Sequence, residues 1–541
     1  MRFTNHRMID WSIKLAAFAV ASVYVYFLTT TLKQPIIEEH SFRQTQTAIS
    51  VFYLLKEGLT LNYITPVVGF PWTIPFEAPV YQISVALFSY ISPFSLDANG
   101  RIVSALYWIG SVVFGYKILR LLFKGNARIA WVFVILALGS PLYMFWSRTF
   151  MIETTALFFG LLFLWGTIKF VQKTNAVILV IAIFSGILCI LAKATTWPAF
   201  VLAGGLYFLA HNCVFLKNWR PAQLTSTTTR GFLTKGAVLL FCVIITLLIG
   251  LSWTAHTDVL KLETLFGRNL TSTNLAAWNY GTLSDRASSA LWSKTILARA
   301  LPEALGQYWY IAILTPMIGW IGLDRNSQRG RAALAVLVCG VLFLLPFLFF
   351  TNLHMVHNYY QSAVSIFIIA AAAILIGTAL SHNAKGLITG MLALGLIFFG
   401  QGSVFLKNYY PYTQNIENFE NAPLHQMALY ANKHVGQDSA ILARGMSWTS
   451  QFHYYAERKG AAIELWFGES EIQKMAQNPA LVFGELPLGG VADCQSVSDE
   501  ENYPKVYKIV SDYVDAQLSH PDQMWTKQVF GHCVLHYRTD L

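Results

Sequence analysis

Long apolar stretches, separated by short polar segments, dominate the chain from its start to about residue 405. A helix needs about 20 apolar residues to cross the hydrocarbon core of a membrane. Eleven stretches approach that length, and each is predicted to span the membrane: Trp11–Thr31, Ile102–Phe123, Ile129–Phe145, Thr154–Val171, Ala176–Leu191, Trp197–Phe215, Gly236–Trp253, Tyr308–Leu323, Ala332–Phe350, Ala363–Leu380 and Gly386–Phe405. The pattern therefore predicts a polytopic α-helical membrane protein with about eleven transmembrane helices.

The basic residues predict which end of each helix faces the cytoplasm. They precede the first predicted span and follow the second, fourth, sixth and eighth: Arg2, Arg7, Lys124, Arg128, Lys169, Lys173, Lys217, Arg220, Arg230, Lys235, Arg325, Arg329 and Arg331. If the helices alternate in direction, all of these residues lie on one side, and cytoplasmic loops are the ones enriched in Lys and Arg. We therefore expect a cytoplasmic N-terminus, exported loops at 32–101 and 254–307, and a C-terminal region on the exported face.

Two further patterns complete the predicted architecture. The segment Phe76–Pro93 is apolar with interspersed polar residues and is short for a span, so we expect an amphipathic helix in the membrane interface. A second interfacial segment or a lid is expected in the loop 254–307. From about residue 406, polar helical patterns alternate with short apolar runs, which indicates a small α/β domain. The helices are expected at Asn421–Val435, Ser450–Lys459 and Pro504–His520, and the strands at Ser439–Leu442, Ala461–Leu465, Ala480–Phe483 and Gln528–Tyr537. The predicted domains are 1–405 in the membrane and 406–541 in the periplasm.

Composition supports a membrane protein and argues against a nucleic-acid partner. The chain is 55% hydrophobic and 12% charged, whereas soluble domains carry about 25% charged residues. The net charge of +10 comes from basic residues spread over short loops, without the clustered patch that binds nucleic acid. The first apolar stretch lacks a small-residue cleavage site, so we expect a retained anchor.

The cysteines divide into two groups. Four of the six lie in or beside apolar stretches and are expected to be ordinary buried thiols. Cys494 and Cys533 lie in the polar C-terminal region. If that region is periplasmic, a disulfide between them is expected, because the periplasm is oxidising. The alternative is two unpaired buried thiols.

The exported loops carry the groups that could perform chemistry. The first loop concentrates Glu38, Glu39, His40, Arg43 and Gln44 directly after the first span. The other exported turns contribute Glu77, Arg148, Glu153, Lys193, His354, His357, Tyr359 and Tyr360. Carboxylates suit the general base that an acceptor hydroxyl needs, and the cations and hydrogen-bond donors suit a departing phosphate. This combination predicts transfer of a group from a lipid phosphate to a hydroxyl.

Each of these residues also has a simpler interpretation. Glu38 and Glu39 could be solvated loop acids, and Glu153 could pair with Arg148 to fix a helix start. Lys193 could extend toward the membrane interface. The spacing of His354 and His357 would allow a metal, although no carboxylate is adjacent and hydrogen bonding is the favoured role. Tyr359 and Tyr360 could belong to an aromatic belt at the membrane surface.

Four motifs resemble those of a known superfamily. They are His40-Ser41-Phe42-Arg43-Gln44, which is close to an H-S-W-R-Q pattern, Phe76-Glu77-Ala78-Pro79-Val80-Tyr81, Arg148 followed by Glu153, and His357-Asn358-Tyr359-Tyr360. On these motifs, residues 1–405 resemble the GT-C superfamily of polyprenyl-phosphate-sugar glycosyltransferases. The nearest branches are bacterial relatives of protein O-mannosyltransferases and lipid A aminoarabinose transferase.

The resemblance implies a function and a catalytic group. It implies an inner-membrane enzyme that moves a hexose or pentose from undecaprenyl phosphate to a hydroxyl of a periplasmic glycan, lipid or protein, with inversion. It also implies two interfacial helices and a catalytic carboxylate in the first exported loop. Many relatives have an Asp-Glu pair in this loop. Here the acids of the loop are Glu38-Glu39, whereas an end-to-end alignment of the loop places Arg43-Gln44 opposite that pair. We choose Glu39 as the base and keep Glu38 and Glu77 as alternatives. No cofactor or metal ligand set is expected, although a divalent cation is compatible with the loop. Residues Trp448, Tyr454, Tyr455 and Arg458 are expected to help bind an acceptor glycan.

Two other functions share parts of this pattern. A transporter or lipid flippase would also be a helical bundle with ionisable groups, but transporters usually show internal repeats and helices broken near the midplane. The sequence shows no internal repeat, and its ionisable groups gather at helix ends. A ligase or polymerase of lipid-linked polysaccharide would share most of the predicted site.

Overall fold

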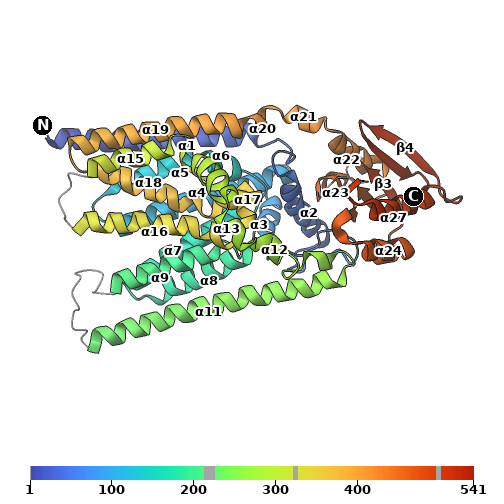
Figure 1. Cartoon of the computed structure of the whole chain (residues 1–541), viewed down its shortest axis with the longest axis horizontal. Helices are drawn as coiled ribbons and strands as arrows, with labels where there is room; N and C mark the ends of the chain where they lie inside the picture. The colour runs from blue at the N-terminus through green and yellow to red at the C-terminus, as the bar shows by residue number, and fades with distance from the viewer. Residues whose placement is uncertain (1, 213–225, 321–326, 447, 495–500) are drawn as a thin grey trace.

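The computed structural model describes residues 2–212, 226–320, 327–446, 448–494 and 501–541. Within them, six helices are long and apolar enough to cross a membrane. They are α1 (Arg2–Thr31), α4 (Leu96–Leu122), α7 (Glu153–Gln172), α11 (Ser226–Glu263), α16 (Ser327–Phe349) and α19 (Ala384–Asn408). The helices lie side by side in an elongated bundle, and the N-terminus and the C-terminal unit lie at opposite ends (Figure 1).

The other predicted spans also correspond to helices, but these are shorter. They are α5 (Ala127–Gly139), α8 (Ala176–Ala192), α9 (Trp197–Asn212), α15 (Trp309–Trp320) and α18 (Ser365–Ala379). The ends of the predicted spans Trp197–Phe215 and Tyr308–Leu323 lie outside the described residues. The predicted single span Ile129–Phe145 is wrong in detail, because Ser140 interrupts it and a separate helix α6 (Pro141–Trp146) follows. Pro141 disfavours a helical conformation at the residue before it, which explains the break.

Short elements gather at the end of the bundle that faces the C-terminal unit (Figure 1). The first loop contains α2 (Ser41–Glu57) and α3 (Val80–Ser89), and the later loops contain η1 (Gly267–Leu270), α12 (Ala276–Tyr280), α13 (Leu283–Ala287), η2 (Ala290–Ala300), α14 (Leu301–Leu305), α17 (Thr351–Val356) and η3 (Asn358–Ala363). Helix α2 begins after His40, whose φ of 51° is left-handed, and it ends at Gly58. The predicted helix over Phe76–Pro93 is shorter than expected at both ends, because it covers only Val80–Ser89. Pro79 disfavours a helical conformation at Ala78, which explains the late start.

The C-terminal unit is a small α/β structure around a five-stranded sheet. Its helices are α20 (Tyr410–Gln414), α21 (Ile416–Glu420), α22 (Pro423–His434), α23 (Gln451–Ala456), α24 (Glu469–Gln477), α25 (Ala480–Phe483) and α27 (Pro504–Leu518), with a short 3-10 turn η4 (Leu465–Phe467). Its strands are β1 (Ala440–Arg444), β2 (Gly460–Ile463), β3 (Leu488–Asp493), β4 (Trp525–Phe530) and β5 (Cys533–Arg538), in the order β2-β1-β3-β5-β4. Strand β1 is parallel to β2 and β3, whereas β5 is antiparallel to β3 and β4.

Three sequence predictions for this unit need correction. The predicted strand Ala480–Phe483 is the helix α25, which follows directly from Pro479. The predicted strand Gln528–Tyr537 is the hairpin β4–β5, which turns at Gly531 with φ 57°. Strand β3 was not predicted, because its two adjacent glycines weaken the usual signal of a strand.

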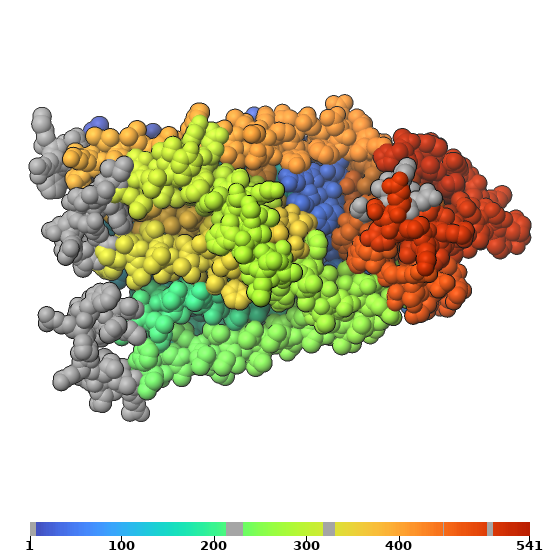
Figure 2. All heavy atoms as spheres, viewed as in Figure 1, coloured from blue at the N-terminus to red at the C-terminus, as the bar shows by residue number. Residues whose placement is uncertain are grey.

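The C-terminal unit is joined to the first loop by backbone pairing and by a shared core. The N–H of Gly460 donates to the carbonyl of Pro66 at 3.0 Å, and the N–H of Ala462 donates to the carbonyl of Val67 at 2.8 Å. This segment therefore covers the β2 edge of the sheet, which would otherwise present unpaired backbone groups. One hydrophobic cluster includes residues from the first loop and from all of β1, β2 and β3. Atoms from early in the chain, drawn in blue, are visible between the bundle and the C-terminal unit (Figure 2).

A disulfide joins Cys494 and Cys533, which are 39 residues apart in the chain. It connects the end of β3 to the start of β5, within the second hydrophobic cluster of the unit. The bond therefore crosslinks two neighbouring strands of the sheet.

Replacing both cysteines with serine is expected to lower the stability of the C-terminal unit by about 4 kcal/mol, because the unfolded chain regains the entropy of a loop of this length. Thermal unfolding of the purified protein in detergent measures the change. A reducing agent should lower the midpoint of the wild type to that of the variant and leave the variant unchanged. Equal midpoints for the oxidised wild type and the variant would contradict this expectation.

Candidate active site

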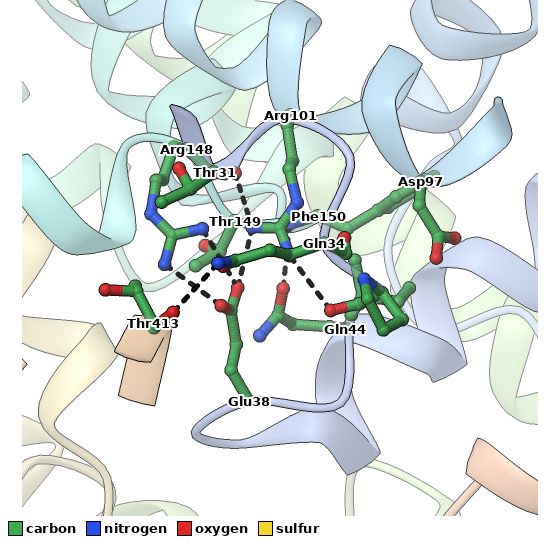
Figure 3. A network of polar contacts seen from close by, with 12 residues as sticks. Thr31, Gln34, Glu38, Gln44, Asp97, Arg101, Arg148, Thr149, Phe150 and Thr413 are labelled. Atoms are coloured by element: carbon green, nitrogen blue, oxygen red, sulfur yellow. Dashed lines mark hydrogen bonds and ion pairs between the residues drawn. The ribbon is translucent and has the colours of Figure 1, made fainter. Parts of the chain in front are cut away.

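Glu38 lies inside the protein between two arginines (Figure 3). Its Oε1 accepts a hydrogen bond from Arg101 Nη1 at 2.6 Å, and its Oε2 accepts one from Arg148 Nη2 at 2.9 Å. None of the three side chains is exposed. Burial alone would raise the pKa of Glu38, but the two guanidinium groups hold it below its usual value. Glu38 is therefore a buried, ionised partner of two cations.

One of these arginines also holds the backbone of the loop before α2. Arg101, from α4, also donates to the carbonyl oxygens of Gln34 and Pro35 at 3.2 and 3.1 Å. The Arg148 guanidinium lies over the ring of Phe145, at 4.8 Å from its centroid. These contacts connect the first loop to α4 and to the segment between α6 and α7.

Gln44 fixes the backbone at Glu39, the residue that follows Glu38. Its amide nitrogen donates to the carbonyl of Glu39 at 3.0 Å, and its amide oxygen accepts from the backbone N–H of Phe150 at 3.1 Å. The Gln44 side chain is fully buried. It therefore positions the backbone beneath Glu39 and does not itself face a substrate.

Glu39, in contrast to Glu38, opens onto a cavity of about 400 Å³. The cavity is lined by Glu39, His40, Arg299, Glu303, Val356, Asn358, Asn408, Tyr409 and Tyr412. Asn358 Nδ2 lies 3.5 Å from Glu39 Oε1, and Tyr412 also contacts the carboxylate. Burial raises the pKa of Glu39 above its ordinary value, while these hydrogen bonds oppose the shift. A partly exposed carboxylate with a raised pKa is suited to accept a proton.

The predicted histidines lie next to the cavity as neutral rings. The His40 ring centroid lies 5.0 Å from that of His357 and 5.1 Å from that of Tyr359. Burial lowers the pKa of His40 to about 4 and the pKa values of His354 and His357 to about 3. Near neutral pH these imidazoles are uncharged, so they can donate or accept hydrogen bonds but do not supply positive charge.

The remaining predicted ions form two pairs away from the cavity lining. Arg43 Nη2 contacts the carboxylate of Glu77, and Lys193 Nζ contacts the carboxylate of Glu153. Glu153 therefore pairs with Lys193 and not with Arg148. The Lys193 ammonium also lies 4.0 Å from the centroid of the Tyr360 ring, which is stacked on Tyr359. Glu39 and His40 therefore line the cavity. Glu38, Gln44 and Arg148 are buried and do not belong to its lining.

Sequence reasoning missed several cavity residues. Arg299 and Glu303 come from the loop predicted at 254–307, and Tyr409 and Tyr412 follow α19. Arg299 donates to the carbonyl oxygens of His354 and Met355. The stretch from Ile296 to Gly306 is otherwise apolar, and ionisable residues in such surroundings are usually functional. That signal could have identified Arg299 and Glu303.

The fold is similar to that of solved protein structures. No protein-family profile matches the sequence, and no curated protein sequence matches it either. Among solved structures, the chain is similar to ArnT from Cupriavidus metallidurans bound to undecaprenyl phosphate, with 11% identity, 96% of this chain and 97% of that chain covered, and a TM-score of 0.59. The apo state of the same protein gives 12% identity, coverage of 98% of both chains and a TM-score of 0.57. The predicted fold class, a helical membrane bundle with a small C-terminal α/β unit, is confirmed by this likeness, whereas the count of eleven spans stays a prediction.

Glu38→Gln is expected to destabilise the protein by about 3–5 kcal/mol, because it leaves two buried guanidinium groups without their carboxylate. The measurement is the thermal midpoint and the yield of monodisperse protein in detergent. Glu39→Gln serves as the matched control and should change both values little, because Glu39 faces a cavity.

The loss of stability in Glu38→Gln should also depend on pH. Because the pKa of Glu38 is lowered in the folded protein, its stabilisation is fully present above the pKa of an unfolded glutamate and is lost as the pH falls toward the folded value. The difference between wild type and Glu38→Gln should therefore shrink in acid. Equal stability of Glu38→Gln and Glu39→Gln at neutral pH would contradict this assignment.

Proposed function

We propose that this chain, which has the GT-C fold, is a membrane glycosyltransferase that moves a sugar from a polyprenyl phosphate carrier to an acceptor hydroxyl. One observation carries the proposal. Glu39, a carboxylate with a raised pKa, lines a cavity together with the cationic Arg299 at the end of the helical bundle. A base and a cation in one cavity meet the two needs of such a transfer. The fold neighbour ArnT, whose name denotes a lipid A aminoarabinose transferase, was solved with undecaprenyl phosphate bound.

In this mechanism Glu39 takes the proton of the acceptor hydroxyl as its oxygen attacks the anomeric carbon. The bond between that carbon and the phosphate oxygen breaks, and the electron pair leaves with the phosphate. Arg299 stabilises the negative charge that grows on the departing phosphate. A single displacement of this kind inverts the configuration of the anomeric carbon.

The contacts of the other candidate bases favour Glu39. Glu38 is enclosed by Arg101 and Arg148, and Glu77 is paired with Arg43. Each of these two acids is paired with a cation, whereas Glu39 contacts the neutral side chains of Asn358 and Tyr412. A carboxylate without a close cation is a better proton acceptor than one whose charge is already neutralised.

The remaining parts of the proposal concern the substrates and the location. The donor is an undecaprenyl-phosphate-linked hexose or pentose, and the acceptor is a glycan, lipid or protein in the periplasm. The protein lies in the bacterial inner membrane with its N-terminus in the cytoplasm. Residues 1–405 form the transmembrane domain and residues 406–541 the periplasmic domain. The position of the ionisable groups at one end of the bundle, and not at its middle, supports transfer over transport.

Glu39→Gln is expected to lower transfer at least about 100-fold, which is the usual minimum contribution of a general base. Mass spectrometry of surface glycans, glycolipids and glycoproteins from cells that carry the wild type or the variant would report the loss. It would also give the sugar mass and the acceptor. Glu417→Gln, at an exposed position of α21, is the control and should leave the modification unchanged.

Normal modification in cells that carry only Glu39→Gln would remove Glu39 from this role. Translocation of a lipid-linked sugar by the purified protein, with no covalent product, would instead support a flippase. A ladder of products longer than one sugar would support a polymerase.

A further inference from the structure

A second carboxyl group, that of Glu303, shares the cavity with Glu39. Glu303 comes from α14, and its side chain is almost completely buried while it lines the cavity. The acids Glu38, Glu77 and Glu153 each contact an Arg or Lys nitrogen. The Glu303 carboxyl contacts instead the hydroxyl of Tyr409 and the side chain of Asn358. The hydrogen bonds of Glu303 are therefore made with neutral side chains, whereas the other three acids are paired with cations.

Asn358 connects the two carboxyl groups of the cavity. Its Nδ2 lies 3.5 Å from Glu39 Oε1 and 3.4 Å from the hydroxyl of Tyr409, which in turn contacts Glu303. Glu39 and Glu303 thus belong to one hydrogen-bonded cluster. Two carboxyl groups in one hydrogen-bonded cluster do not readily ionise together, because the second charge is repelled by the first.

The charged and titratable groups around Glu303 can be named element by element. Arg299 comes from η2, Tyr409 from the end of α19, and Glu39 from the loop before α2. Helix α6 contributes Tyr143, whose hydroxyl donates to the carbonyl of Ser362. The described parts of α15 and α18, which also pack against α14, carry no charged side chain. Burial raises the pKa of Glu303 to about 7, Glu39 adds to this, and Arg299 and Tyr409 oppose it.

The charge of the departing phosphate favours a neutral acid beside it. The donor is a phosphodiester with a single negative charge, whereas the polyprenyl phosphate that departs is a monoester and carries a charge of about −1.5 to −2 near neutral pH. The proposed base Glu39 must meanwhile be ionised to accept a proton. A second carboxylate in a cavity of about 400 Å³ would repel that phosphate. A protonated carboxyl in the same place offers a hydrogen-bond donor to a phosphate oxygen.

We infer that Glu303 is a protonated acid that binds the phosphate of the lipid donor and gives its proton to the departing phosphate. The inference rests on the proposed function. In the transfer step, the bond from the acceptor oxygen to the anomeric carbon forms and the bond to the phosphate oxygen breaks. The acceptor proton ends on Glu39, and the proton gained by the phosphate comes from Glu303. Movement of one proton from Glu39 to Glu303 restores the starting state.

The affinity for undecaprenyl phosphate between pH 6 and pH 8.5 tests this role without any transfer. Glu303→Gln is the matched variant, because its amide remains a hydrogen-bond donor but cannot ionise. The ratio of the wild-type Kd to the variant Kd is expected to be about 1 at pH 6. It should rise at least about tenfold by pH 8.5, since binding weakens by up to tenfold per unit above the pKa of a group that must be protonated. Both proteins bind the same ligand, so the effect of the ligand's own ionisation on Kd cancels in the ratio.

Several outcomes would overturn the inference. A ratio that stays constant with pH would show that Glu303 does not titrate against the phosphate. Tighter binding by Glu303→Gln at every pH would show that Glu303 is an anionic partner of Arg299. Absence of undecaprenyl phosphate binding by the wild type at any pH would overturn the proposed donor, and this inference with it. Binding that is pH-independent in the wild type would overturn only the inference.

A second variant keeps the test decisive if Glu303→Gln does not fold. Tyr409 lowers the pKa of Glu303 by hydrogen bonding to it, so Tyr409→Phe should raise that pKa. The pH at which wild-type affinity falls should then move upward in Tyr409→Phe. An unchanged midpoint would contradict the role of Glu303, and Tyr412→Phe, which contacts Glu39 and not Glu303, is the control.

Discussion

A buried carboxylate between two buried guanidinium groups holds the candidate site in place. Removing three charges from water is costly, and such a cluster persists only when its members are well hydrogen-bonded. Glu38 meets Arg101 and Arg148 at 2.6 and 2.9 Å, and Arg101 also binds the carbonyl oxygens of the loop that carries Glu38. The cluster therefore ties together the first loop, α4 and the segment before α7. Glu39 follows Glu38 directly in the chain, so the fixed position of Glu38 also places Glu39 at the cavity.

The charges around this cluster are arranged so that few of them reach the cavity. Arg43 and Lys193 are each occupied by a carboxylate, and the nearby histidines are neutral because burial lowers their pKa values. The charge of the cavity is consequently set by Arg299 and by the protonation of two carboxyl groups. The loss of one proton from these three side chains therefore makes the field that an anionic ligand meets more negative.

Hydropathy predicted the helical bundle well, because length and apolarity are properties of each segment alone. It could not predict the break at Ser140 from apolarity, although Pro141 marks it, and it missed β3, whose glycines do not have the composition of a strand. The residues that line the candidate site were harder to predict from the sequence. Glu38 and Glu39 are identical in type and adjacent, and their different surroundings are made by Arg101 and Arg148, which lie 63 and 110 residues away in the chain. Local sequence contains no information about such contacts, and the motif could identify the pair but not the member that faces the cavity.

The contact between Ile36 and Tyr455 has a consequence for how the protein is made. The backbone N–H of Ile36 donates to the Tyr455 hydroxyl at 2.9 Å, across 419 residues of chain. The same hydroxyl donates to Asp97 at the start of α4. At about 5–20 residues per second, a ribosome needs roughly 20–80 s to add Tyr455 after Ile36. During that interval the first loop is already outside the ribosome without its last partner, so the contacts of the loop that carries Glu39 are completed only when most of the polypeptide has been translated.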